Sequence, residues 1–158
     1  MEEYAAVKPI RAWGPAIVWM GVIYMMSAMP GDVSGETSGR LVHMILWAIS
    51  LVFGEEFAAG LPLETVHLII RKAAHMAEYA VLFFLYRRAL KLSGGKHPGM
   101  AALFLSACYA ATDEWHQSFV ADRAPSVVDV FIDTLGAAAM WILIYIAGKI
   151  QSAIKKER

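Results

Sequence analysis

The C-terminal part of the chain contains an apolar segment long enough to cross a lipid bilayer. It reads SVVDVFIDTLGAAAMWILIYIAG over residues 126–148, and about 20 apolar residues span the hydrocarbon core as an α-helix. The whole chain of 158 residues is 58% hydrophobic and 18% charged, with a mean hydropathy of +0.50. Soluble domains contain fewer apolar and more charged residues. The sequence therefore predicts an all-α membrane protein.

Three further segments are predicted to cross the membrane, at about residues 13–29, 65–90 and 98–117. The first is predicted to be a retained anchor rather than a cleaved signal peptide, because two acidic residues precede its bases. Between the first two segments, PGDVSGETSGR is predicted to be a polar loop. The apolar stretch at 41–53 is too short to cross comfortably, so an interfacial or re-entrant helix is favoured over a fifth crossing. We expect a single domain over residues 1–158, a polytopic bundle of four transmembrane helices.

Basic residues predict the direction of these helices. Ten lie in the two tails and in the segment joining the second and third predicted spans, and two lie in the remaining loops. The ten are Lys8, Arg11, Arg87, Arg88, Lys91, Lys96, Lys149, Lys155, Lys156 and Arg158, and the two are Arg40 and Arg123. Cytoplasmic loops carry the excess of Lys and Arg. Both termini, including a tail at 149–158, are therefore predicted to be cytoplasmic, which requires an even number of crossings.

With this direction, the intramembrane charges fall at one depth, in the outer half of the membrane. Lys72, His75 and Tyr79 share one helix face, and Asp129 and Asp133 share another. The third predicted span contributes Asp113, Glu114 and Gln117 at its outer end. Ionisable groups at membrane depth normally face the bundle interior, where they pair or reach water. The pattern predicts an outward-open polar pocket, and ion pairs that only fix helix register are the structural alternative.

The same residues resemble a known family. KAAHMAEYAVL and DEWHQSFVADRAPSVVDVFIDTLGA are similar to two sequence elements of VanZ-like membrane proteins, and MMSAMPG resembles the Ser-x-x-Pro that ends their first span. The VADRAP loop of this chain lacks the glycine that often stands beside the arginine in the family, so its turn geometry is expected to differ. The resemblance implies a bacterial cytoplasmic-membrane protein linked to teicoplanin resistance and cell-envelope processes, and it implies no settled biochemical activity. It carries over to Lys72, His75, Glu78, Tyr79, Asp113, Glu114, Gln117, Arg123, Asp129, Asp133 and Gly136.

The residue types in the predicted pocket suit binding of an anionic lipid or cell-wall precursor. Arg and Lys recognise phosphate and carboxylate groups, and Lys72, Tyr79, Gln117, Arg123, Asp129 and Asp133 are the candidate binding residues. The alternative is a membrane-embedded hydrolase or transferase acting on a lipid-linked substrate, with His75 as the acid or base. Its candidate catalytic residues are His75, Glu78, Asp113 and Glu114.

Other classes remain open from the sequence. A divalent metal is an alternative cofactor, with ligands drawn from His75, Glu78, Asp113, Glu114, His116, Asp129 and Asp133. A small transporter is a third class, because carboxylates at membrane depth mark such pathways. A homodimer is compatible with the sequence. The net charge of zero gives no basic surface for nucleic acid.

Overall fold

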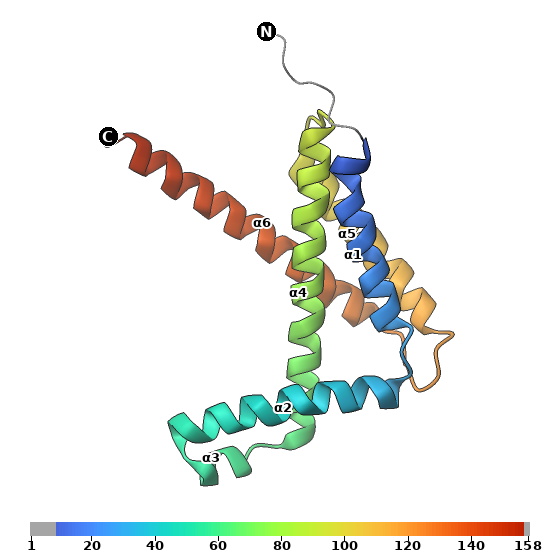
Figure 1. Ribbon diagram of the computed structural model, residues 1–158, viewed down its shortest axis with the longest axis vertical. Coiled ribbons are helices and arrows are strands. Elements are labelled where there is room, and N and C mark those ends of the chain that lie inside the picture. Colours follow the sequence, from blue (N-terminus) through green and yellow to red (C-terminus); the bar gives the residue numbers. More distant parts are fainter. Residues whose placement is uncertain (1–8, 157–158) are drawn as a thin grey trace.

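The computed structural model describes residues 9–156, and this range contains six helices and no strand. Side chains are described throughout it except at residues 31–38 and 40. Lys8 and Arg158, two of the bases used to predict the topology, lie outside the described residues. The helices are α1 (Pro9–Ser27), α2 (Gly31–Phe53), α3 (Glu55–Ala59), α4 (Leu63–Leu92), α5 (Pro98–Gln117) and α6 (Val127–Lys156) (Figure 1).

The long helices follow the apolar segments of the sequence. Helix α5 begins at Pro98, which suits the first turn because its missing N–H would have no intrahelical partner there. Helix α4 ends before Gly94, whose φ of 76° lies in the left-handed region that favours glycine after a helix. Helix α6 continues past residue 148 to Lys156. The described part of the predicted cytoplasmic tail is therefore an extension of this helix.

The segment between α1 and the apolar stretch at 41–53 differs from its prediction. It was expected to be a polar loop, but α2 already begins at Gly31 and runs without interruption to Phe53. Glycine and serine weaken a helix without stopping it, and no proline follows Pro30 in this stretch. Helix α2 lies across the lower end of α4 rather than alongside it (Figure 1). The axis of α2 is therefore steeply inclined to that of α4.

Helix α4 forms the centre of the bundle and packs against α1, α5 and α6. It contributes Tyr79, Leu82, Phe83 and Tyr86 to the buried core. Its closest neighbour is α6, which crosses it at Gly136. A Cβ atom added at Gly136 would lie 2.7 Å from the Met76 Cα and closer still to the Met76 carbonyl oxygen. Only a glycine allows the two backbones to approach this closely.

Two part-buried hydrogen bonds to backbone carbonyls attach helix α1 to the bundle. The indole N–H of Trp19 donates to the carbonyl oxygen of Glu78 on α4 at 3.0 Å. The hydroxyl of Tyr109 on α5 donates to the carbonyl oxygen of Met20 at 2.7 Å. Carbonyl oxygens inside a helix are already bonded once, but each has a second lone pair that can accept. These bonds fix the depth of α1 against α4 and α5.

Among the described helices, α6 is the one whose length and hydropathy suffice for a membrane crossing, and the apolar stretch Leu41–Phe53 of α2 is shorter. In α4 the apolar run is interrupted by Arg71, Lys72 and Glu78. The predicted four-span arrangement is therefore not established by helix composition.

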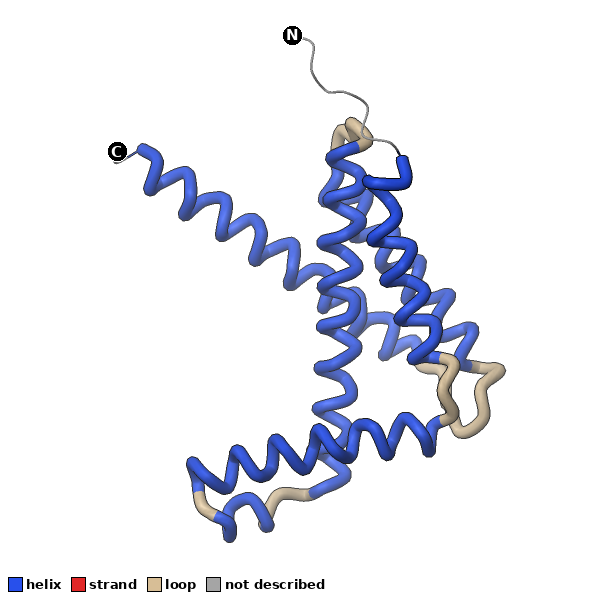
Figure 2. The backbone as a smooth tube through the Cα atoms, in the orientation of Figure 1, coloured by secondary structure: helices blue, strands red, loops and turns tan. Residues whose placement is uncertain are grey.

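The tube view in Figure 2 shows that α1 begins, α4 ends and α6 ends toward the same side of the molecule. This side carries most of the basic residues.

Candidate functional site

A polar cavity lies where α4, α5 and α6 meet the loop that joins α5 to α6. Its volume is about 190 Å³. Charged side chains of both signs line it, together with a histidine and a glutamine. The charged and polar lining residues are Arg71, Lys72, His75, Glu114, Gln117, Asp122, Arg123, Asp129 and Asp133.

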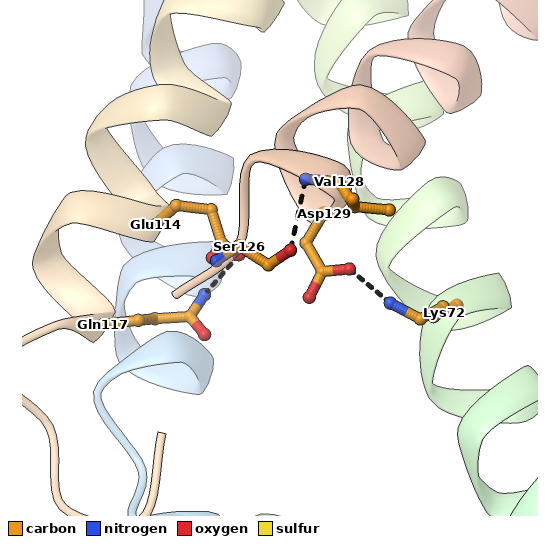
Figure 3. A network of polar contacts seen from close by, with 6 residues as sticks. All are labelled: Lys72, Glu114, Gln117, Ser126, Val128 and Asp129. Atoms are coloured by element: carbon orange, nitrogen blue, oxygen red, sulfur yellow. Dashed lines mark hydrogen bonds and ion pairs between the residues drawn. The ribbon is translucent and has the colours of Figure 1, made fainter. Parts of the chain in front are cut away.

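An ion pair joins α4 to the first turn of α6 across this cavity. The ammonium group of Lys72 contacts the carboxylate of Asp129, and both side chains are about one-third exposed (Figure 3). Asp129 is also near the positive end of the α6 dipole, which favours a carboxylate there. The charge of Lys72 is therefore largely balanced within the protein.

Glu114 and Gln117 organise the start of α6. One carboxylate oxygen of Glu114 accepts the backbone N–H of Ser126 at 2.8 Å, and the Ser126 hydroxyl accepts the N–H of Val128 at 3.2 Å (Figure 3). Ser126 thus caps the helix in the usual way. The Gln117 amide donates to Asp113 at 3.1 Å and to Glu114 at 3.4 Å. These bonds hold the buried acids of α5 and tie them to the loop.

Two arginines in the cavity wall supply positive charge without an ion pair to any described carboxylate. Among the described side chains, neither Arg71 nor Arg123 forms an ion pair. The guanidinium Nε–H of Arg123 donates to the carbonyl oxygen of Met29 at 3.3 Å. Burial, and after it the charge of Arg71, lowers the pKa of Arg123, although arginine stays protonated in proteins. An anion between the two guanidinium groups would relieve their mutual repulsion.

The loop that presents Arg123 contains an unusual backbone conformation at Asp122, whose φ is 56°. This is the left-handed region, where glycine is favoured and aspartate is among the few other residues tolerated. A glycine would adopt this conformation without steric cost. Asp122 meets the same requirement and adds a carboxylate to the cavity wall.

His75 and Asp133 form the deeper part of the site. The Nδ1 atom of His75 lies 3.7 Å from the Glu78 carboxylate, beyond hydrogen-bond distance. Asp133 is 1% exposed, and neither of its carboxylate oxygens has a hydrogen-bond partner among the described residues. A buried carboxylate is costly without a partner. The cavity at Asp133 is therefore suited to a ligand or water that donates a hydrogen bond.

The structure divides the residues predicted for the site into two groups. Seven line the cavity: Lys72, His75, Glu114, Gln117, Arg123, Asp129 and Asp133. Glu78, Tyr79 and Asp113 are not among its lining residues, and the hydroxyl of Tyr79 is buried without a hydrogen-bond partner in the described part of the chain. His116 turns away and packs on the ring of Tyr24, with centroids 4.4 Å apart.

Two lining residues, Arg71 and Asp122, were not among the predicted site residues. Their only signal in the sequence was adjacency, since Arg71 precedes Lys72 and Asp122 precedes Arg123. Neighbours on a helix point in different directions, so adjacency alone could not select them.

The described side chains do not form a preorganised metal centre. No group of three His, Cys, Asp or Glu residues within the described range is placed to hold an ion. Basic groups also stand among the acids, and Lys72 contacts Asp129 directly.

Comparison with known proteins agrees with the resemblance seen in the two motifs. No curated protein and no solved structure matches this chain. The sequence model of the VanZ/LLP1 family matches residues 12–148, a range that contains every residue lining the polar cavity. The chain belongs to the VanZ/LLP1 family.

Proposed function

We propose that this protein is a four-span protein of the bacterial cytoplasmic membrane whose polar cavity binds an anionic group at the outer face. The ligand is the phosphate or carboxylate of a membrane lipid or of a cell-envelope precursor. Binding of such a precursor would link the protein to glycopeptide resistance, as the family resemblance implies.

The observation that carries this proposal is the imbalance of charge pairing in the cavity. Lys72 is paired with Asp129, and Glu114 accepts the Ser126 N–H. Arg71 and Arg123 remain without an ion-pair partner among the described side chains. Charge-assisted hydrogen bonds from arginine to phosphate or carboxylate are strong and often bidentate. An anion of the ligand would complete the pairing.

The dimensions of α4 agree with a site near the outer membrane surface. Twenty residues separate Lys72 from Leu92, which corresponds to about 30 Å of helix, the thickness of the hydrocarbon core. If Leu92 lies at the inner surface, Lys72 lies at the outer one. A cavity of about 190 Å³ has room for a phosphate group and a few waters, since one water occupies ~30 Å³ in the liquid.

The topology can be tested by labelling single cysteines in intact cells, starting from a Cys108→Ser background. Ala121→Cys lies in the loop beside Arg123 and should react with a membrane-impermeant thiol reagent from outside. Lys96→Cys lies in the opposite loop and should react only after the membrane is opened. Labelling of Lys96→Cys in intact cells would overturn the predicted direction.

Ligand binding can be tested with the double variant Arg71→Gln/Arg123→Gln. Purified protein should retain phosphatidylglycerol, observed as bound lipid by native mass spectrometry. Each lost charge-assisted bond is worth about 1.5–3 kcal/mol, so the variant should lose retention at this site at least about tenfold. If expression of the wild-type protein raises the teicoplanin resistance of a susceptible host, the same variant at matched expression should not raise it.

Arg88→Gln/Lys96→Gln is the matched control, because it removes two positive charges away from the cavity. It should retain the lipid as the wild type does. Equal retention by the cavity variant and the wild type would mean that the arginines have a structural role only.

A membrane-embedded enzyme is the second candidate function, because His75 lines the cavity and stands near Glu78. Such a histidine could move a proton during transfer or hydrolysis of a lipid-linked substrate. His75→Gln keeps hydrogen-bonding capacity and removes the titratable group. A binding protein should retain ligand nearly unchanged in this variant. An enzyme should still bind substrate and lose turnover by a factor of about 100 or more.

A further inference from the structure

The C-terminal half of α6 separates from the rest of the bundle. Beyond its crossing with α4 the helix leans away and stands apart from the other helices (Figure 1, Figure 2). Large apolar side chains are exposed along this half. They are Ile142, Leu143, Tyr145, Ile146, Ile150 and Ile154.

A second cavity, with a volume of about 420 Å³, occupies the wedge between α4 and this part of α6. Trp141, Ile144 and Tyr145 form its apolar wall. Arg87 from α4 and Lys149 from α6 place positive charge on it, and Ser152 adds a hydroxyl group. No acidic residue within residues 9–156 lines this wedge cavity. The cavity therefore combines an apolar surface with positive charge from two helices.

Trp141, the largest side chain of this wall, is held in place by the bundle. The Trp141 ring stacks on Phe83, with centroids 6.2 Å apart and an interplanar angle of 27°. Gly99 at the start of α5 leaves room for this ring, because a Cβ atom there would lie 3.0 Å from it. Lys149 places its ammonium group 5.6 Å from the centre of the Tyr145 ring, within the range of a cation–π interaction. Trp141 and one of the two cations are thus positioned by contacts within the protein.

The wedge cavity lies far along α6 from the polar cavity. Twenty residues separate Asp129 from Lys149, about 30 Å along the helix. This is one thickness of the hydrocarbon core. Lys149 is therefore expected at the inner surface, where tryptophan and tyrosine also gather and where anionic lipids attract basic groups.

We propose that the wedge cavity binds one anionic phospholipid of the inner leaflet, with its phosphate between Arg87 and Lys149. Its acyl chains lie against Trp141 and Ile144, in the space that α6 leaves by leaning away from α4. This lipid site rests on the membrane direction proposed above, but it is separate from the polar cavity and does not depend on what the polar cavity binds.

Charge favours a lipid over a second copy of the chain as the occupant. From Leu135 to Lys156 the sequence of α6 contains three lysines and no acidic residue. A symmetric contact places the same surface patch on both subunits. It would therefore bring the Lys149 side chains of the two copies close together. Like charges in such a contact repel, whereas a lipid phosphate offers the opposite charge.

The test compares retention of phosphatidylglycerol and phosphatidylcholine by the purified full chain in native mass spectrometry. We expect Arg87→Gln/Lys149→Gln to lose retention of phosphatidylglycerol at one site about tenfold or more, since two charge-assisted bonds are removed. Lys155→Gln/Lys156→Gln is the matched control, because it removes two charges from the same helix end outside the wedge cavity. Retention of phosphatidylcholine should be low and equal in all three proteins.

Two results would overturn the proposal. One is unchanged phosphatidylglycerol retention in the wedge variant. The other is efficient disulfide-linked dimer formation by Ser152→Cys in a Cys108→Ser background, which would show that a second copy covers the wedge. The Arg71→Gln/Arg123→Gln variant distinguishes the two cavities, because it should leave one phosphatidylglycerol bound at the wedge.

Discussion

Replacement of Gly136 by alanine should destabilise the protein by at least about 3 kcal/mol, at the upper end of the usual cost of overpacking. The added methyl group would collide with the backbone of Met76. A backbone carbonyl inside a helix cannot rotate away as a side chain can, so α4 and α6 would have to move apart. The loss of stability is measured by heating the detergent-solubilised protein and analysing it afterwards by size-exclusion chromatography.

Gly148→Ala is the matched control on the same helix. No atom lies within 4 Å of a Cβ added at Gly148, and alanine favours a helix by about 1 kcal/mol over glycine. Gly148→Ala should therefore be neutral or stabilising. Equal stability of the two variants would show that α4 and α6 do not cross at Gly136.

Glu114→Ala is expected to have the second-largest effect, because Glu114 joins α5 to the start of α6. The change leaves the Ser126 N–H and one Gln117 contact without an acceptor. A hydrogen-bonding group left unsatisfied away from water costs about 1–3 kcal/mol. The loop that carries Arg123 should also lose its position, so lipid retention at the polar cavity should fall together with thermal stability.

Glu114→Gln separates the hydrogen bond from the charge. Its amide oxygen can still accept the Ser126 N–H, so this variant should keep most of the stability that Glu114→Ala loses. Glu64→Ala removes an exposed carboxylate from the start of α4 and should change little. Wild-type stability of Glu114→Ala would contradict the role assigned to the contact between Glu114 and Ser126.

The helix positions could be read from the sequence because long apolar runs bounded by proline and glycine leave few alternatives. The spacing of Asp129 and Asp133 also indicated the face of α6 on which Gly136 meets α4. The start of α2 at Gly31 could not be read in this way. Its residues have weak helix propensity, and tertiary context overrides weak propensity.

Within the site, helical spacing selected a face but could not give the depth of each side chain. Tyr79 shares the stripe of Lys72 and His75, yet it is fully buried beside Phe83 in the core. His116 lies two residues after Glu114, and successive helix positions diverge around the axis. Its contact with Tyr24 depends on how α1 packs against α5, which the local pattern does not encode.

The capping of α6 has a consequence for how selective the polar cavity can be. A free helix N-terminus is a ready anion site, because its N–H groups and the helix dipole have fixed directions. Here Glu114 and the Ser126 hydroxyl accept N–H groups at that terminus, and Asp129 adds a negative charge in the first turn. An incoming anion must therefore be held by the guanidinium groups of Arg71 and Arg123, whose long side chains can adjust their reach. Such a site discriminates by charge more than by shape, and it would accept anionic head groups of several sizes.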